Sequence, residues 1–318
     1  MRPNAAAPTP WPSATAPPTT NPASPVADGG QANRLQTLVG GPAQLRVVAI
    51  LAAVLALDGA DKGTVGATAA DLQRSFDISN TGIGLLSAVA TLVGAAATIP
   101  VGALTDRVTR TRLLAGSIVV WAVAMLFGAL APSYHWLLVS RLALGAVSAT
   151  AGPTVASLTG DFFPAAQRAR IYGFILVGEF AGTGAGFAIS GALGSLIGWR
   201  AAFGWLVLPG AVLAAIVWRL DEPARGAAGR PTPEQRADPA QAVTQRGVEP
   251  YANQVLHTDP ARAGLWWAIR YVLRVRTNVV IIAASALTYF YFAGVRTFIM
   301  LFAQHHYRVS SGTASALL

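Results

Sequence analysis

The chain has 318 residues, of which 53% are hydrophobic and 12% charged, and its mean hydropathy is +0.48. Soluble domains carry about 25% charged residues, so this composition favours a membrane protein with several spans over a soluble enzyme. The chain has no cysteine, which excludes disulfides and Cys-ligated metals. Its four histidines have no metal-ligand spacing, and we predict no metal site.

The net charge of +9 would suit a nucleic-acid binder, but the distribution of the charges argues against one. Basic residues gather in alternate loops between apolar stretches, which is the positive-inside pattern of membrane proteins. The sequence also lacks a G-x-x-x-x-G-K-[ST] phosphate loop, so ATP drive is not expected. We predict neither a nucleic-acid partner nor a cofactor.

Residues 1–43 are rich in Pro, Ala, Thr and Ser. Such a segment cannot bury enough apolar surface to fold, and it lacks the apolar core of a signal peptide. We predict a disordered cytoplasmic tail.

Seven apolar stretches then have the length of membrane-spanning helices. We place them at about 47–69, 81–104, 113–131, 137–159, 171–197, 201–219 and 278–303. The first six form a predicted N-terminal six-helix half over residues 44–220. Residues 278–318 then read as the start of a C-terminal half, whose eighth span begins in "SSGTASALL" and is truncated at Leu318.

A hydrophilic stretch over residues 221–277 separates these two parts and reads as a flexible linker. Its last part, "AGLWWAIRYVLRVRTN", mixes aromatic and aliphatic residues with arginines. This pattern predicts a helix near 264–276 that lies in the cytoplasmic membrane interface.

The orientation follows from the 23 lysines and arginines. Outside the spans, only Arg74, Arg200 and Arg308 fall on the side opposite the N-terminus and the linker. The positive-inside rule therefore predicts a cytoplasmic N-terminus and a cytoplasmic linker, in a multi-pass protein of the plasma (inner) membrane.

The first span contains "LDGADKGTVG", which places Asp58, Asp61 and Lys62 among apolar residues. On a helix the three side chains share an arc of about 100°. A charge at the bilayer centre costs roughly 3 kcal/mol, so this arc should face a polar interior. Asp58 and Lys62 could simply neutralise each other at i,i+4. Alternatively the carboxylates bind protons, because burial favours the protonated form and a nearby cation favours the charged form.

Three further spans each carry one charge: Arg141, Glu179 and Arg296. Glu179 reads as a second proton carrier or as a buried acid paired with Arg141. Arg296 reads as a cavity-lining residue or as one near the outer interface. In the fifth span, Gly178, Gly182 and Gly186 recur every four residues, which predicts a helix-packing face.

The loop "GALTDRVTRTRLL" after the second span contains Gly102, Asp106, Arg107 and Arg110. Gly102 should let two helices approach closely. Taken alone, the loop could be an ordinary basic cytoplasmic loop with one acid. A related cluster, "GDFFPAAQRARIYG", follows the fourth span with Asp161 and Arg168, and it too could be a solvated loop.

These two stretches resemble the cytoplasmic signature of the major facilitator superfamily, G-x-L-a-D-r-x-G-r-k, with Thr109 in place of the second glycine. The resemblance implies an all-α fold of two six-helix halves. It also implies a cytoplasmic gate formed by Asp106, Arg107 and Arg110, with Asp161 and Arg168 as a second charge cluster. Arg141, followed by Gly145, resembles the family's span-four R-x-x-x-G motif, which implies proton coupling or anion binding.

Within that family the sequence is similar to the spinster-like branch. Those proteins carry Asn-x-x-Asp-Arg in span one, where this chain has Asp58, Asp61 and Lys62, and their signature loop also lacks the glycine. The branch's span-four glutamate is Ser148 here. The branch is associated with lipid-like substrates.

We therefore predict a secondary, proton-driven transporter that moves a small amphipathic molecule by alternating access. We expect this transporter to be a monomer. Asp61 is the first candidate for the proton site, with Lys62 tuning it and Asp58 and Glu179 in reserve. Arg141 and Arg296 are the candidates for substrate coupling. The alternative is a non-transporting scaffold, a receptor-like protein or an inactive transporter fragment. An intramembrane enzyme is disfavoured, because the spans show no catalytic dyad.

Overall fold

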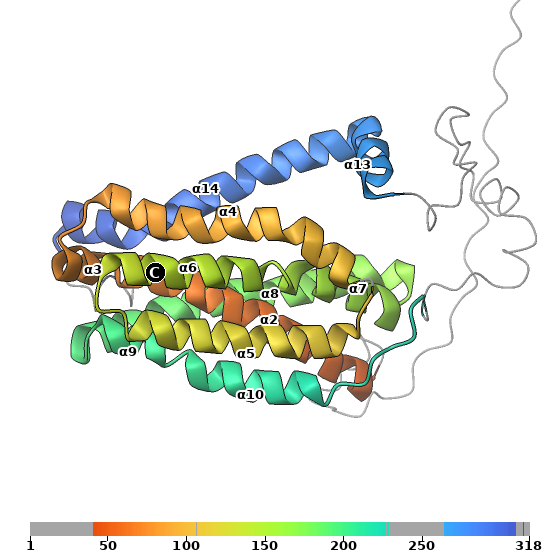
Figure 1. Cartoon of the computed structure of the whole chain (residues 1–318), viewed down its shortest axis with the longest axis horizontal. Coiled ribbons are helices and arrows are strands. Elements are labelled where there is room, and N and C mark those ends of the chain that lie inside the picture. The colour runs from red at the N-terminus through yellow and green to blue at the C-terminus, as the bar shows by residue number, and fades with distance from the viewer. Residues whose placement is uncertain (1–40, 106, 227, 229–263, 310–313, 315–318) are drawn as a thin grey trace, which may run out of the picture.

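The computed structural model describes residues 41–105, 107–226, 228, 264–309 and 314 (Figure 1). This part of the chain is helical and contains no strand, which confirms the predicted all-α class. Seven stretches are long and apolar enough to cross a membrane. They are α2 (Pro42–Ala67), α4 (Asn80–Thr105), α5 (Arg110–Ala129), α6 with α7 (Tyr134–Ser148 and Ala151–Phe162), α8 (Ala165–Leu196), α9 with α10 (Trp199–Gly204 and Val207–Trp218) and α14 (Arg276–Tyr307).

The seven predicted spans are confirmed in number and order for the described residues. Two short helices, α3 (Ala69–Phe76) and α13 (Leu265–Arg274), lie between them in the sequence. The predicted tail, most of the predicted linker and nearly all of the predicted eighth span lie outside the described residues. The division into two halves therefore stays a prediction.

Proline divides two of the spans into paired helices. Pro153 is the third residue of α7 and Pro209 is the third residue of α10. Proline has no N–H for the carbonyl four residues earlier, and its ring crowds that carbonyl, so the regular helix ends just before it. Pro100 lies within α4, whose ribbon bends in its last turns (Figure 1).

The closest helix contact joins α2 to α8 and depends on glycine. A Cβ atom at Gly182 would collide with the backbone of Ala56, and one at Gly59 would collide with the carbonyl of Glu179. Gly178 and Gly186 are similarly tight against α2. The predicted glycine packing face is confirmed, because only residues without a side chain let two backbones approach so closely.

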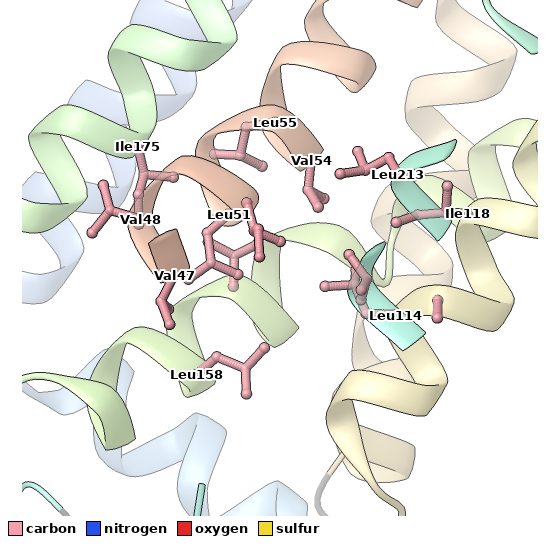
Figure 2. Close-up of a cluster of buried hydrophobic side chains, with 14 of the residues drawn as sticks. Val47, Val48, Leu51, Val54, Leu55, Leu114, Ile118, Leu158, Ile175 and Leu213 are labelled. Carbon is pink, nitrogen blue, oxygen red and sulfur yellow. The ribbon is translucent and has the colours of Figure 1, made fainter. Parts of the chain in front are cut away.

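Two large apolar clusters form most of the core among the described residues. One gathers side chains of α2, α5, α7, α8 and α10, with Val47, Leu51 and Leu158 among them (Figure 2). The other lies toward α3 and α9 and includes Ala60 and Leu137. The charged stretch of α2 runs between the two clusters, so the core is interrupted by polar groups at one level.

Many large apolar side chains face outward, as expected for helices surrounded by lipid. This holds most clearly for α14, which diverges from the bundle toward α13 and leaves Phe290 80% exposed (Figure 1). With seven such helices the chain is a multi-pass membrane protein.

Candidate functional site

A cavity of about 260 Å³ lies between α2, α4, α6 and α14. Its charged lining consists of Asp58, Asp61, Lys62, Arg141 and Arg296. Hydroxyl side chains add to the polar lining: Ser87, Thr91, Thr98, Ser148 and Thr297. The predicted polar interior behind the α2 charges is thus confirmed, and residues from four separate spans meet there.

The deepest ion pair of the cavity joins Asp61 on α2 to Arg141 on α6. Arg141 Nη1 donates to Asp61 Oδ1 at 2.7 Å, and the two residues are 2% and 7% exposed. The guanidinium also lies 4.9 Å from the ring centre of Phe203. Arg141 Nε is buried and has no hydrogen-bond partner among the described residues. The pair therefore holds one unused donor beside the cavity.

A second ion cluster surrounds Lys62. Its ammonium pairs with Asp58 one turn earlier, as predicted, and lies 3.4 Å from Glu179 Oε1 on α8. The alternative in which Glu179 pairs with Arg141 is wrong, because Glu179 lies beside Lys62 and Arg141 pairs with Asp61. That Lys62 tunes Asp61 stays a prediction; its ion partners are Asp58 and Glu179.

Helix geometry explains these pairings. Asp61 and Lys62 are adjacent, so their side chains leave α2 about 100° apart. Asp61 consequently faces α6, whereas Lys62 faces α8. The sequence predicted that all three charges share one side of α2. It could not show that this side faces two different helices, α6 and α8.

Arg296 lines the cavity from α14, as predicted. The backbone of Arg296 contacts α2 where a Cβ at Gly66 would collide with its carbonyl. One residue later, Thr297 Oγ1 and Ser87 Oγ on α4 are 3.3 Å apart. The sequence reading missed this hydroxyl pair, since serine and threonine are common in spans.

A separate charged cluster closes the end of the bundle that bears α13. Arg110, only 1% exposed, pairs with Asp161 at the end of α7 and donates from Nε to Glu222 Oε1 at 2.7 Å. Arg110 Nη1 also donates to Ser157 Oγ at 2.9 Å. The two loop clusters thus meet at Arg110 and Asp161, and their role as a gate stays a prediction.

Glu222, just after α10, was missed by the sequence reading. Its other oxygen accepts from the Thr111 backbone N–H at 2.9 Å. Partial burial would raise the pKa of its carboxyl, but the hydrogen bonds from Thr111 and Arg110 outweigh burial and lower the pKa below its usual value. The available signal was an acid directly after span six, at the same membrane side as Arg110.

The other predicted gate residues do not join the ion cluster of Arg110 among the described residues. A Cβ at Gly102 would meet nothing within 4 Å, so the predicted close helix contact is wrong for the described residues. Arg107 is exposed. Arg168 donates to the carbonyls of Phe163 and Gly160, which closes the end of α7. Asp106 lies outside the described residues.

Comparison with known proteins agrees with this architecture. The family model described as Major Facilitator Superfamily matches residues 51–318. The chain belongs to the major facilitator superfamily. Membership in this family of transporters points to transport rather than catalysis.

Relatives within the superfamily include spinster proteins, in agreement with the resemblance. Protein spinster homolog 1 of Xenopus laevis is 28% identical over 211 residues, which cover 64% of this chain and 40% of that protein. The Bos taurus homolog is 31% identical over 216 residues, which cover 66% of this chain and 40% of that protein. The chain thus spans about 40% of the length of these relatives.

The fold is also similar to a solved structure described as a bacterial homolog of the human lysosomal transporter spinster, in an inward-facing and occupied conformation. The TM-score is 0.63 at 22% identity, over 86% of this chain and 56% of the other. At this identity the likeness concerns the fold alone.

The described residues bring together no group of three or more His, Cys, Asp or Glu side chains that could hold a metal ion. Instead, Asp61 pairs with Arg141, and Lys62 pairs with Asp58 and Glu179. With Arg296 in the lining, the three acids in or beside the cavity are matched by three bases.

Proposed function

We propose that the protein is a secondary active transporter that uses a proton gradient to move a small amphipathic molecule by alternating access. The observation that carries this proposal is the buried Asp61–Arg141 pair at the wall of the cavity. Ionisable residues inside a membrane are rare and typically mark substrate or proton pathways.

Proton binding and anion binding are coupled by the geometry of this pair. When Asp61 takes up a proton, Arg141 loses its countercharge, and a buried cation without a partner is strongly unfavourable. An anionic group of a substrate in the cavity would restore the balance, because Arg141 lines that cavity. By linkage, substrate binding then favours the protonated state to the same extent.

Asp58 and Glu179 are the reserve proton sites. They share one ammonium, that of Lys62, so one proton on either acid would leave a neutral pair behind. Lys62 is accordingly assigned to this cluster rather than to Asp61.

The shape of the neighbouring surface supports an amphipathic cargo. A groove of about 390 Å³ lies between α8 and α14 and is lined by Phe180, Phe187, Tyr289 and Phe292. Arg296 lines both this apolar groove and the charged cavity. A molecule with a charged head in the cavity and an apolar tail in the groove would satisfy both surfaces.

The Arg110 cluster supports a role as the cytoplasmic gate. It joins α5, α7 and the segment after α10 through charge-assisted hydrogen bonds, which can hold these ends together in one state of the cycle. Gly102, Asp106, Arg107 and Arg168 are further gate candidates. Whole-protein features complete the proposal: a monomer in the plasma membrane, with cytoplasmic N-terminus and linker.

The test is reconstitution into proteoliposomes that carry an entrapped pH-sensitive dye, with a panel of amphipathic anions and cations. Under an imposed pH gradient the protein should accumulate one of these compounds, with proton movement. Asp61→Asn should abolish gradient-driven accumulation and keep exchange down a substrate gradient, because a neutral side chain mimics one protonation state only.

Two further variants test whether the proton site is Asp61 and not another carboxylate. Asp58→Asn tests the reserve site, and Asp71→Asn removes a carboxylate that pairs with Arg74 on α3, outside the cavity. Unchanged accumulation by Asp61→Asn would disprove its role. Substrate binding without any movement would favour the alternative of a non-transporting protein.

A further inference from the structure

Helix α13 presents apolar and cationic side chains that no other described helix covers except at its junction with α14. Trp266 is 82% exposed and Leu273 is 53% exposed, and Val272 is exposed as well. Its sequence, LWWAIRYVLR, contains two arginines and no acid. No acidic side chain of the described residues pairs with its two arginines, and its apolar side chains are exposed at the protein surface.

The covalent connection fixes the depth of α13 in the membrane. Only Val275, in extended conformation, separates α13 from α14. Asn278 Nδ2 donates to Val272 O at 3.3 Å and so ties the end of α13 to the first turn of α14. With 32 residues α14 is about 48 Å long, which exceeds the roughly 30 Å hydrocarbon core. Its first turn therefore reaches the headgroup layer, and α13 lies there, turned away from the axis of α14 (Figure 1).

The side chains of α13 are sorted around its axis in a way that suits this layer. Arg270 and Arg274 are four residues apart and project from one face. Trp266 and Trp267 flank this face on either side. Trp267 stacks on Tyr271 with ring centres 5.4 Å apart and planes at 6°. Tryptophan and tyrosine favour the headgroup region, and arginine reaches from there to phosphate.

We propose that α13 is a binding surface for anionic phospholipid headgroups, with Arg270 and Arg274 as the phosphate-binding pair and Trp266 as its membrane anchor. Both arginines line one shallow hollow of the helix surface together with Trp266. Guanidinium groups bind phosphate through paired hydrogen bonds, and a zwitterionic headgroup offers no net charge to hold them. This surface is independent of the proposed transport activity.

A membrane occupant explains the observations better than a protein or a nucleic acid. A nucleic acid would use the arginines but leave the apolar arc of Ala268, Val272 and Leu273 in water. A soluble protein partner would have to reach a helix held at the membrane boundary by its junction with α14. Lipid alone meets both faces at the depth that the connection to α14 imposes.

The experiment uses the full chain in phosphatidylcholine nanodiscs in which a fraction of the lipid carries brominated chains, which quench nearby tryptophans. The brominated lipid is either phosphatidylglycerol or phosphatidylcholine. Each basic side chain near an anionic surface raises affinity about fivefold. Half-maximal quenching should therefore need at least about fivefold less brominated phosphatidylglycerol than brominated phosphatidylcholine at low salt.

Variants assign the effect to α13. Trp266→Phe with Trp267→Phe should remove the anionic-specific quenching, since the chain has eight tryptophans and only these two lie on α13. Arg270→Gln with Arg274→Gln should abolish the lipid preference, whereas Arg270→Lys with Arg274→Lys should keep most of it. Arg170→Gln with Arg219→Gln removes two exposed charges elsewhere at the same end of the bundle and should have little effect.

Equal quenching by the two lipids would overturn the proposal, as would a preference that survives in the glutamine pair. Absence of quenching by either lipid would show that α13 is covered by protein, which also overturns it. Size-exclusion elution like that of the unaltered protein confirms that each variant is folded.

Discussion

At the scale of single residues, the cavity depends on which cation meets which carboxylate. Asp61 and Lys62 are neighbours in sequence and serve separate ion clusters. Arg141 is the more deeply buried cation, and its only described carboxylate partner is Asp61. Replacing either residue of the pair should therefore lower stability mainly because the other is left as a buried, unpaired charge.

We expect Arg141→Gln to destabilise the protein by about 3 kcal/mol, because it leaves Asp61 buried without its partner. The double variant Asp61→Asn with Arg141→Gln should recover a large part of this loss, since no buried charge remains. The measurement is the free energy of unfolding in mixed detergent micelles.

Asp71→Asn with Arg74→Gln is the matched control, since this pair includes an arginine that is 75% exposed. An exposed pair contributes at most about 1 kcal/mol, so neither single variant should differ much from the double. Additive effects at Asp61 and Arg141 would contradict the buried-pair interpretation.

At the scale of helices, the contact between α2 and α8 brings two backbones closest together. Glycines on both helices bring the backbones together, so a small side chain in this contact has no space. The neighbouring glycine Gly184 is on the same helix, but a Cβ there would meet nothing within 4 Å. Gly182 and Gly184 are both helical, so a comparison of the two isolates the effect of packing against α2.

Gly182→Ala should therefore lower stability, because its Cβ would collide with the backbone of Ala56. Gly184→Ala should be neutral or raise stability by up to about 1 kcal/mol, since alanine favours helix over glycine. Thermal unfolding of the purified protein in detergent measures both. A Gly182→Ala variant as stable as the parent would show that the helices can separate without cost.

The helices of this protein could be predicted from its sequence, whereas the partners of its buried charges could not. Hydropathy and length give all seven spans, and the four-residue glycine repeat gives the packing face of α8. The pairing of Glu179 could not be derived, because periodicity gives the angle of a side chain on its own helix and not the identity of the facing helix. Glu222 was equally hidden, since it gains its partners only when α10 returns beside α5.

At the scale of the whole molecule, the segment after α10 holds one end of the bundle together. Glu222 binds Arg110 and the backbone of Thr111, and the backbone N–H of Gly226 donates to Asp161 Oδ1 at 2.8 Å. Arg225 Nη2 donates to the carbonyl of Thr105 at 2.8 Å. One short segment thus joins the ends of α4, α5 and α7. The stability of this connection should depend on the charge of Glu222.

The dependence on pH follows from the lowered pKa of Glu222 in the folded state. Above the usual carboxyl pKa both states are ionised, and the full stabilisation by Arg110 and Thr111 is present. As the pH falls through the lowered folded pKa, the carboxyl is protonated in both states and the stabilisation is lost. Glu222→Gln should therefore cost about 1 kcal/mol near neutral pH, and the difference from the parent should disappear in strong acid.

Thermal unfolding at a series of pH values from about 7 to about 3 checks this expectation. Asp221→Asn removes the neighbouring exposed acid and controls for the change in net charge. If the Glu222→Gln difference were the same at every pH, its effect would come from packing and not from the carboxylate. A pH-dependent difference confined to Glu222 would instead show that ionisation of this one side chain holds the ends of three helices together, which is the property that a cytoplasmic gate requires.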